Sequence, residues 1–183
     1  MLKAKKGRLL ISEPTLNDNI FFKSVVLLTY HNDDESIGLI LNHPTKINLN
    51  EILNNIPLSD FPVYIGGPVE KQSLHFLHTL GELIPNSIKI TNAIYFGGDF
   101  DTVIQLMQDK KITKNEIRFF VGYSGWGEDQ LNAEIREDSW IVENSQDKLC
   151  MEYSTPKLWR DIIKTKKSDY AIWANMPKDP NLN

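Results

Sequence analysis

One segment of the chain has residue types that could support nucleophilic catalysis. Gly122-Tyr123-Ser124-Gly125-Trp126 follows a predicted strand and precedes a predicted helix, which is the setting of a serine nucleophile elbow. An elbow requires Gly-x-Ser-x-Gly, because small residues two positions before and after the serine relieve a strained turn. Trp126 stands where the second glycine would be, and no spacing nominates a histidine base or an acid. The segment is therefore predicted to be a tight strand-to-helix turn rather than a hydrolase site.

The four histidines do not have the spacing of a metal site. His75 and His78 are three residues apart in a predicted strand, so their side chains point to opposite faces. His31 and His43 lie on the two arms of a predicted hairpin. With the turn between them, His43 pairs opposite Ser24, roughly 23 Å from His31 at ~3.3 Å per residue. Neither a metal site nor a cofactor is expected.

Two glycine pairs could in principle cradle phosphate. Gly66-Gly67-Pro68 and Gly97-Gly98-Asp99 have neither the Gly-x-Gly-x-x-Gly spacing nor that of a P-loop. Paired glycines at the end of a strand more often mark turns that need positive φ. No constellation of catalytic residues therefore follows from the sequence.

The composition is that of a folded protein with an ordinary surface. The chain has 183 residues, 41% of them hydrophobic, and fits one domain over residues 1–183. Its net charge of −4 argues against non-specific binding of nucleic acid, and no helix-turn-helix with a basic recognition helix is present. The longest cationic cluster, Lys3, Lys5, Lys6 and Arg8, is predicted to be a solvated tail.

The number of cysteines and the length of the apolar runs indicate in which cellular compartment the protein is expected. Cys150 is the one cysteine, which excludes an intrachain disulfide and a zinc site of several cysteines. The longest apolar runs are about five residues, whereas a spanning helix needs ~20. We therefore expect a cytoplasmic protein that binds neither membrane nor nucleic acid directly.

The hydrophobic patterns predict the elements that position these residues. Strands are expected near residues 9–11, 24–30, 37–42, 62–65, 74–78, 88–90, 94–96, 117–122 and 140–142, and helices near 48–56, 99–107, 130–137 and 158–163. Asn48, and Asp99 or Asp101, are predicted helix N-caps. Strands and helices are interspersed without strict βαβ alternation, which favours a single α+β domain with a mostly antiparallel sheet flanked by helices. The strands at 24–30 and 37–42 are almost continuously apolar and should be covered on both faces.

The same segments resemble the AlgH/YqgE family of bacterial proteins. The matching stretches run in order through nearly the whole chain: residues 7–12 with Pro14, 22–28, 37–42 with Pro44, 66–69, 77–78, 122–126 with Gln130, Leu131 and Glu134, Trp140, Trp159-Arg160, and 179–183. One departure is Asp129, where the family usually has glycine before the glutamine. The resemblance implies an α+β fold whose sheet is bent and partly barrel-like.

The resemblance implies little about chemistry. The family takes its name from a proposed transcriptional regulator of alginate synthesis, and it supplies no catalytic residues to carry over. We therefore expect a non-enzymatic regulatory or binding protein that acts through an unknown protein or small-ligand partner. The alternative is an enzyme of unrecognised type that uses polar groups around residues 122–130.

If the chain has a partner site, two glycine-rich segments are its predicted location. The candidate residues are Gly66, Gly67, Pro68, Tyr123, Ser124, Gly125, Trp126 and Gln130. Their glycines expose backbone and allow close approach, and their aromatic side chains could anchor a partner. They would then lie together at one edge of the sheet, whereas the alternative is that each segment is only a strained corner.

Overall fold

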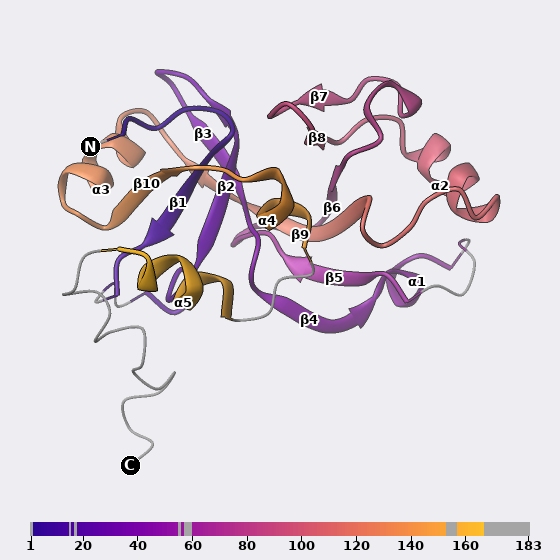
Figure 1. Ribbon diagram of the computed structural model, residues 1–183, viewed down its shortest axis with the longest axis horizontal. Coiled ribbons are helices and arrows are strands. Elements are labelled where there is room, and N and C mark those ends of the chain that lie inside the picture. The colour runs from indigo at the N-terminus through magenta and orange to yellow at the C-terminus, as the bar shows by residue number, and fades with distance from the viewer. Residues whose placement is uncertain are drawn as a thin grey trace, which may run out of the picture.

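The computed structural model describes residues 2–14, 16, 18–54, 56, 60–152 and 157–166 (Figure 1). The strands are β1 Arg8–Ser12, β2 Val25–His31, β3 Ser36–Ile40, β4 Pro44–Asn48, β5 Pro62–Ile65, β6 Val69–His78, β7 Ile88–Lys89, β8 Tyr95–Phe96, β9 Ile117–Trp126 and β10 Trp140–Asn144. The helices are α1 Leu49–Ile52, α2 Phe100–Gln108, α3 Gln130–Arg136, α4 Asp147–Met151 and α5 Lys157–Lys164, with a 3-10 turn, η1, at Gly81–Leu83. The family-like tail at 179–183 lies outside the described residues. In the part described, no helix is long and apolar enough to cross a membrane.

These ten strands form one curled sheet (Figure 1). Its main path runs in the order β10-β1-β2-β3-β9-β6-β8-β7, and β4 joins it through β5. Within the described residues only β5 and β9 pair in parallel, and the other pairs are antiparallel. Helices lie on both faces of the sheet. The predicted α+β fold with a bent, mostly antiparallel sheet is confirmed.

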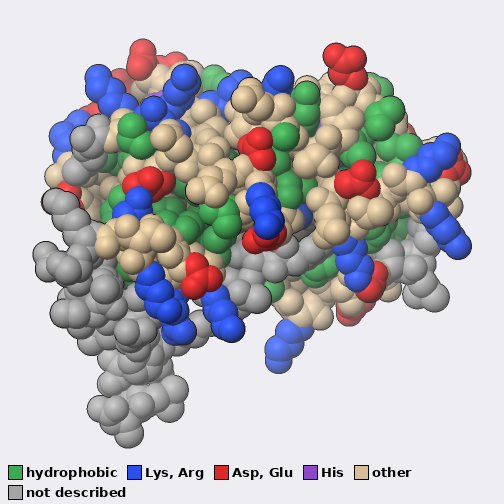
Figure 2. All heavy atoms as spheres, in the orientation of Figure 1, with side chains coloured by type: hydrophobic (Ala, Val, Ile, Leu, Met, Phe, Trp, Pro, Cys, Tyr) green, Lys and Arg blue, Asp and Glu red, His purple; other side chains and the backbone are tan. Residues whose placement is uncertain are grey.

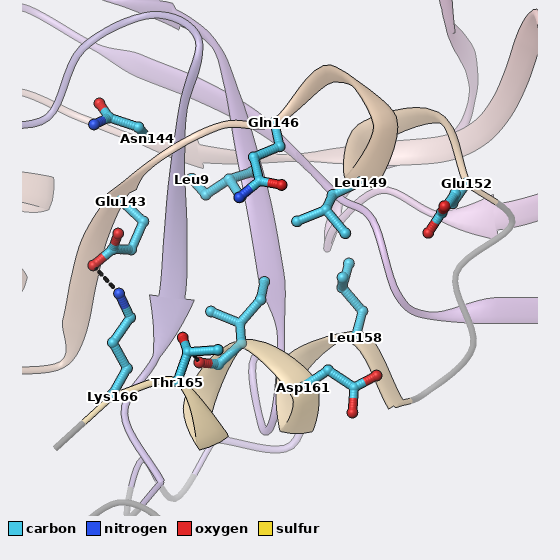
Figure 3. A pocket seen from close by; sticks show the side chains of 11 residues that line it. Leu9, Glu143, Asn144, Gln146, Leu149, Glu152, Leu158, Asp161, Thr165 and Lys166 are labelled. Atoms are coloured by element: carbon cyan, nitrogen blue, oxygen red, sulfur yellow. Dashed lines mark hydrogen bonds and ion pairs between the residues drawn. The ribbon is translucent and has the colours of Figure 1, made fainter.

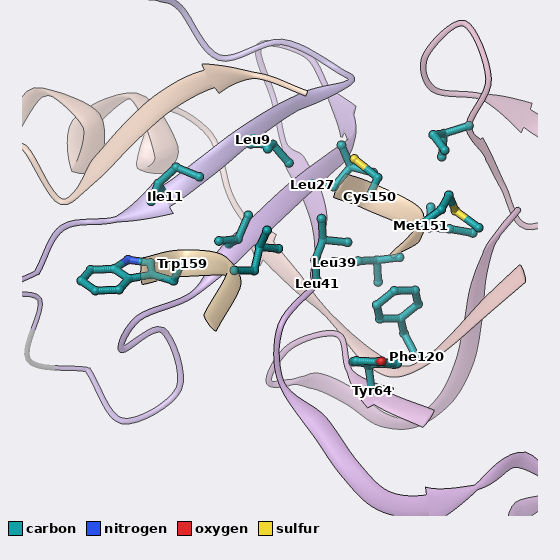
Figure 4. Close-up of a cluster of buried hydrophobic side chains, with 14 of the residues drawn as sticks. Leu9, Ile11, Leu27, Leu39, Leu41, Tyr64, Phe120, Cys150, Met151 and Trp159 are labelled. Carbon is teal, nitrogen blue, oxygen red and sulfur yellow. The ribbon is translucent and has the colours of Figure 1, made fainter. Parts of the chain in front are cut away.

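The β2–β3 hairpin is covered on both faces, as its apolar pattern predicts. Leu27 faces one core cluster together with Trp159 of α5 (Figure 4). Val26, the next residue along, faces a second cluster together with Leu131 of α3. Alternate residues of the strand thus point to opposite faces, and a helix packs over each.

A third cluster lies beneath α2 and is anchored by a predicted helix cap. Val103 and Met107 of α2 pack with Phe119 of β9. At the start of this helix, the Asp99 carboxylate accepts a hydrogen bond of 2.9 Å from the backbone N–H of Thr102. The N-cap prediction is confirmed at Asp99.

The segment at residues 122–126 is not a strand-to-helix turn, so that prediction was wrong. The strand expected to end at Gly122 continues to Trp126, and its second half pairs with β3. Gly122 has φ 66° inside the strand, and the β6–β9 register shifts opposite it. The glycine therefore marks a bulge that re-aims the strand without ending it.

Candidate functional site

The two predicted glycine-rich segments lie side by side where β9 changes its neighbour. One edge of β9 pairs with β6, while its other edge pairs first with β5 and then with β3. Gly66 stands at the change: its N–H donates to the carbonyl of Val121 at 2.9 Å. Its carbonyl accepts from a backbone amide of β3 at 2.9 Å and from Ser124 Oγ at 3.0 Å. We call this meeting of three strands, residues 66–68 and 122–126, the strand junction.

Close backbone approach accounts for the paired glycines of the junction. A Cβ added at Gly66 would lie 2.2 Å from the carbonyl oxygen of Gly122. One added at Gly67 would lie 2.2 Å from the carbonyl of Tyr123. Both distances are too short for any side chain, so steric necessity explains this pair without a phosphate ligand.

Four of the candidate site residues, Gly66, Gly67, Ser124 and Trp126, are buried in the junction. Ser124 has no exposed surface, and its hydroxyl donates to Gly66. Trp126 is only 3% exposed, and its indole N–H donates to Glu134 at 2.8 Å. Trp140 donates to the same carboxylate oxygen at 2.7 Å. The side chains of Ser124 and Trp126 therefore stabilise the fold through buried packing and hydrogen bonds, and they are not exposed to a partner.

The remaining candidates reach the surface to different degrees. Pro68 and Tyr123 are partly exposed, while Gly125 and Gln130 are exposed. Gln130 lies at the start of α3, where its side-chain amide donates to Glu134 at 2.9 Å. The structure brings the two segments together, and a partner-binding role for them stays a prediction.

The residue before Gln130 has the backbone conformation that glycine adopts most freely. Asp129 has φ 50°, in the left-handed region, so the turn takes a glycine-like conformation although its residue differs from the family's usual glycine. Its carboxylate forms an exposed ion pair of 2.8 Å with Arg136. This pair and its hydrogen bond lower the pKa of the Asp129 carboxyl.

Each histidine has a serine hydroxyl within hydrogen-bonding distance. The pairs are His31–Ser36 at 2.7 Å, His43–Ser24 at 3.1 Å, His75–Ser73 at 2.8 Å and His78–Ser87 at 3.0 Å. The predicted proximity of His43 and Ser24 is confirmed. Ser24 is fully buried and its hydroxyl also donates to the carbonyl of Ile20, so it lacks the open position of a nucleophile.

His75 and His78 point to different sides of β6, as predicted. The His75 ring packs against Tyr123 and Phe96, at 5.6 and 5.9 Å between ring centres. His78 is buried against Phe76 on the other face. In the described ranges there is no group of three or more His, Cys, Asp or Glu residues that could hold a metal ion.

The one cysteine belongs to a buried polar arrangement beneath α4. The guanidinium of Arg118, fully buried on β9, donates to the carbonyls of Cys150 and Leu41 at 2.7 and 2.6 Å. It also lies 4.3 Å from the centre of the Tyr64 ring. Burial raises the pKa of the Cys150 thiol to about 12, which keeps it protonated and a poor nucleophile.

A pocket of about 460 Å³ opens between β10, α4 and α5 (Figure 3). Its floor is apolar and comes from three separate parts of the chain: Leu9, Leu149, Leu158 and Ile162. Around the opening stand the carboxylates of Glu143, Glu152 and Asp161, the amide of Gln146, and Lys166. We call it the acid-rimmed pocket. An apolar floor with a few converging polar groups is typical of small-molecule sites.

The rim of this pocket carries a net negative charge. Lys166 forms an ion pair with Glu143 (Figure 3), and both side chains are partly buried. Asp161 and Glu152 supply two further carboxylates. Glu152 forms an ion pair of 3.5 Å with Lys148, whose side chain is 86% exposed. With Lys148 counted as well, the three rim carboxylates still outnumber the two lysines by one, so the opening favours a cationic group.

Comparisons with known proteins agree with this fold. The AlgH-like family, DUF179, matches residues 9–171. The chain is 39% identical to UPF0301 protein BF2109 of Bacteroides fragilis over 97% of this chain and 91% of that protein. It is 37% identical to a UPF0301 protein of Cytophaga hutchinsonii, over 97% and 98% of the two chains.

Two solved structures have the same fold at low sequence identity. The solution structure of AlgH from Pseudomonas aeruginosa is 21% identical and superposes with a TM-score of 0.73 over 98% of this chain and all of that one. The crystal structure of DIP2367 from Corynebacterium diphtheriae is 18% identical, with a TM-score of 0.74 over 96% and 94% of the two chains. With the family match covering most of its length, the chain belongs to the AlgH-like family.

Proposed function

We propose that this protein is a non-enzymatic regulatory protein of the cytoplasm that binds a small organic cation in the acid-rimmed pocket. The ligand class is an amine attached to a short apolar body. The amine would sit between Asp161 and Glu152, and the apolar body would cover Leu149, Leu158 and Ile162.

The observation that supports this proposal is the pairing of an apolar floor with an excess of carboxylates at the rim. Ligand pockets typically measure about 300–1,000 Å³, and this one falls within that range at about 460 Å³. Contact with the floor removes apolar surface from water, which favours binding by roughly 25 cal/mol per Å². The rim carboxylates select the charge of the ligand.

A non-enzymatic role is supported by the state of the nucleophile candidates. Ser124 is buried and donates to a backbone carbonyl, and Cys150 is a buried, protonated thiol. The alternative is an enzyme built on polar groups around residues 122–130. A fluorophosphonate probe distinguishes the two: we expect no labelling of the folded protein, whereas labelling abolished by Ser124→Ala would favour the enzyme.

Ligand binding is tested with three probes that share one hydrocarbon chain. Hexylamine, hexanol and hexanoate are titrated against the ¹⁵N-labelled full chain at low salt. We expect hexylamine to bind most tightly and hexanoate least, with the largest chemical-shift changes at residues 146–149 and 158–166. Equal binding of hexanol and hexylamine would remove the proposed role of the carboxylates.

A double variant isolates the contribution of the rim. Asp161→Asn with Glu152→Gln should weaken hexylamine binding about fivefold, since two exposed charge contacts together contribute roughly 1 kcal/mol. Asp34→Asn with Glu128→Gln removes the same charge from exposed sites outside the pocket; this double variant is the matched control and should leave binding unchanged. The same loss in both variants would show a general charge effect and contradict the proposal.

A further inference from the structure

A second concave surface lies on the other side of the β10–α4 connection and has the opposite charge. This groove of about 690 Å³ is lined by Lys5, Lys6 and Arg8 of the N-terminal segment, by Lys89 and Asn92 of the β7–β8 region, and by Ser145 of the β10–α4 connection. We call it the basic groove. Four cations against one carboxylate, Asp147, give its lining a formal charge of +3, although the whole chain carries −4.

A glycine makes this convergence of charge possible. Gly7 has φ 82°, and its N–H donates to the carbonyl of Leu28 at 2.8 Å. A Cβ at this position would lie 2.8 Å from the carbonyl oxygen of Ile90. The N-terminal segment therefore crosses the β7–β8 connection in direct backbone contact, which brings Lys5, Lys6 and Arg8 to the same groove as Lys89.

The N-terminal cations, predicted from the sequence to be a solvated tail, thus form one part of the basic groove. In the sequence the N-terminal cations form a visible cluster but Lys89 does not belong to it, because about 80 residues separate them. Figure 2 shows Lys and Arg side chains along the upper edge of the molecule, from the region of the N-terminus towards β7. Lys5, Lys6 and Lys89 are exposed and Arg8 is partly exposed.

Local hydrogen bonds hold the loop after Lys89 in place beside the groove. The hydroxyl of Thr91 accepts from the backbone N–H groups of Ala93 and Ile94, at 3.3 and 3.0 Å. The same hydroxyl donates to Asp147 at 2.5 Å. The loop after Lys89 is therefore tied both to itself and to α4, and the groove's single carboxylate already has a protein partner.

The lining also indicates which kind of anion would fit. Among the described residues no aromatic side chain lines the groove, and Ile90 is the one large apolar residue there. It therefore lacks a platform on which nucleic-acid bases could stack. Lysines act as point charges for phosphate, and amide or hydroxyl groups such as those of Asn92 and Ser145 can donate to phosphate oxygens. A chain of linked phosphates matches an open groove whose cations come from two separate segments of the chain.

From these observations we propose that the basic groove binds a chain of linked phosphates. Free inorganic oligophosphate and the phosphate tail of a nucleotide share this chemistry. The proposal goes beyond the amine-binding function, because the two sites lie on opposite sides of the β10–α4 connection and take ligands of opposite charge.

The test is a titration of the full chain with sodium tripolyphosphate, ATP and adenosine. Binding is followed by calorimetry and by amide chemical shifts at 50 and 200 mM NaCl. We expect tripolyphosphate to shift amides at residues 5–8, 89–92 and 144–147, with affinity falling steeply as salt rises. Equal affinities for ATP and tripolyphosphate would assign the site to free oligophosphate, while tighter ATP binding would assign it to a nucleotide tail.

Paired variants separate the groove from general charge. Lys6→Gln with Lys89→Gln should weaken tripolyphosphate binding at least about fivefold, from the loss of two exposed charge contacts. Lys46→Gln with Lys71→Gln removes the same charge from exposed sites outside the groove and should have little effect. Both double variants should still bind hexylamine as the unmodified chain does, so failure of either proposal can be recognised separately.

Several results would overturn the proposal. These are an absence of shifts in the groove, an equal loss in both double variants, or tighter binding of duplex DNA than of tripolyphosphate. Tighter binding of a hexa-aspartate peptide would likewise replace the phosphate ligand with an acidic segment of a protein partner.

Discussion

The strand junction and the acid-rimmed pocket are made from opposite kinds of residue. In the junction, Gly66 and Gly67 leave no room for a Cβ, and Ser124 is fully buried. The pocket has leucine, isoleucine and acidic side chains of ordinary types, contributed by β1, β10, α4 with its C-cap and α5, and it is open to solvent. The glycines of the junction are thus required by close backbone packing. The surface that a ligand can reach is formed instead by ordinary leucine, isoleucine and acidic side chains.

The largest effect that distinguishes the two regions should come from the junction glycines. Gly67→Ala places a methyl group on the backbone of β9, and we expect a loss of more than about 4 kcal/mol in the free energy of unfolding. Urea unfolding measures it. Gly127→Ala is the control, because a Cβ there meets nothing within 4 Å. If Gly67→Ala unfolded at the same urea concentration as the wild type, the backbone of the junction would have to shift to accommodate a Cβ, contrary to the prediction.

The next effect concerns the buried tryptophan of the junction. Trp126→Ala should cost about 3–5 kcal/mol through the cavity it leaves. Trp126→Phe retains much of the packing but loses the hydrogen bond to Glu134, and should cost less, about 1–2 kcal/mol. Loss of a partner without loss of stability in Trp126→Ala would restore Trp126 to a recognition role.

A moderate decrease in the free energy of unfolding is expected when the pH is lowered. The N–H of Leu80 donates to Nδ1 of His78 at 3.3 Å, and Nε2 lies 3.0 Å from the carbonyl of Gly97, an arrangement that fits a neutral ring. Burial lowers the pKa values of His75 and His78 below 6.5. The folded state therefore binds fewer protons than the unfolded state, and stability present above pH 6.5 falls as the pH drops through that value.

Urea unfolding between pH 7.5 and 5 measures this loss. The carboxyl groups with lowered pKa values start from 3.8, so their contribution is lost only at lower pH. His75→Phe should reduce the slope, because it removes one of the two histidines. Stability that is constant or rises towards pH 5 would contradict the prediction.

The smallest effect should come from the turn between the junction and α3. Asp129→Gly relieves a left-handed residue at the cost of an exposed ion pair whose side chains are 62% and 64% exposed. Such pairs contribute little, so the melting temperature should rise by roughly 1–4 °C. Arg136→Gln breaks the same pair without changing the backbone, and should lower the melting temperature slightly or not at all. A lower melting temperature for Asp129→Gly than for Arg136→Gln would contradict this account.

Much of the fold could be predicted because its signals are local. The apolar runs of β2 and β3 predict a doubly covered hairpin, and the cap at Asp99 can be seen from residue type and position alone. Three elements were missed, among them the 3-10 turn η1. Strand β4 is mostly exposed and polar and has no alternating pattern, while α4 has only five residues.

The sites were harder to predict than the fold because they depend on convergence in space. The acid-rimmed pocket joins Leu9 to residues more than 130 positions away, and the basic groove joins Lys5 to Lys89. The turn predicted at Gly122 was wrong for a different reason. A glycine with positive φ marks a turn in most contexts, but Gly122 lies in a bulge within a continuous strand. Only its neighbours β3 and β6 show that the strand continues.

The pairing of β1 with β10 has a consequence for the order in which the protein is made. Ser12 lies opposite Trp140 in this pair, so the partner strand leaves the ribosome 128 residues later. At ~5–20 residues per second, the wait is roughly 6–26 s. During that interval β1 can pair with β2, but its other edge has no native partner, and unpaired edges template association between chains. Synthesis of this protein therefore includes a brief period of exposure to misassembly, which ends when β10 emerges and covers that edge.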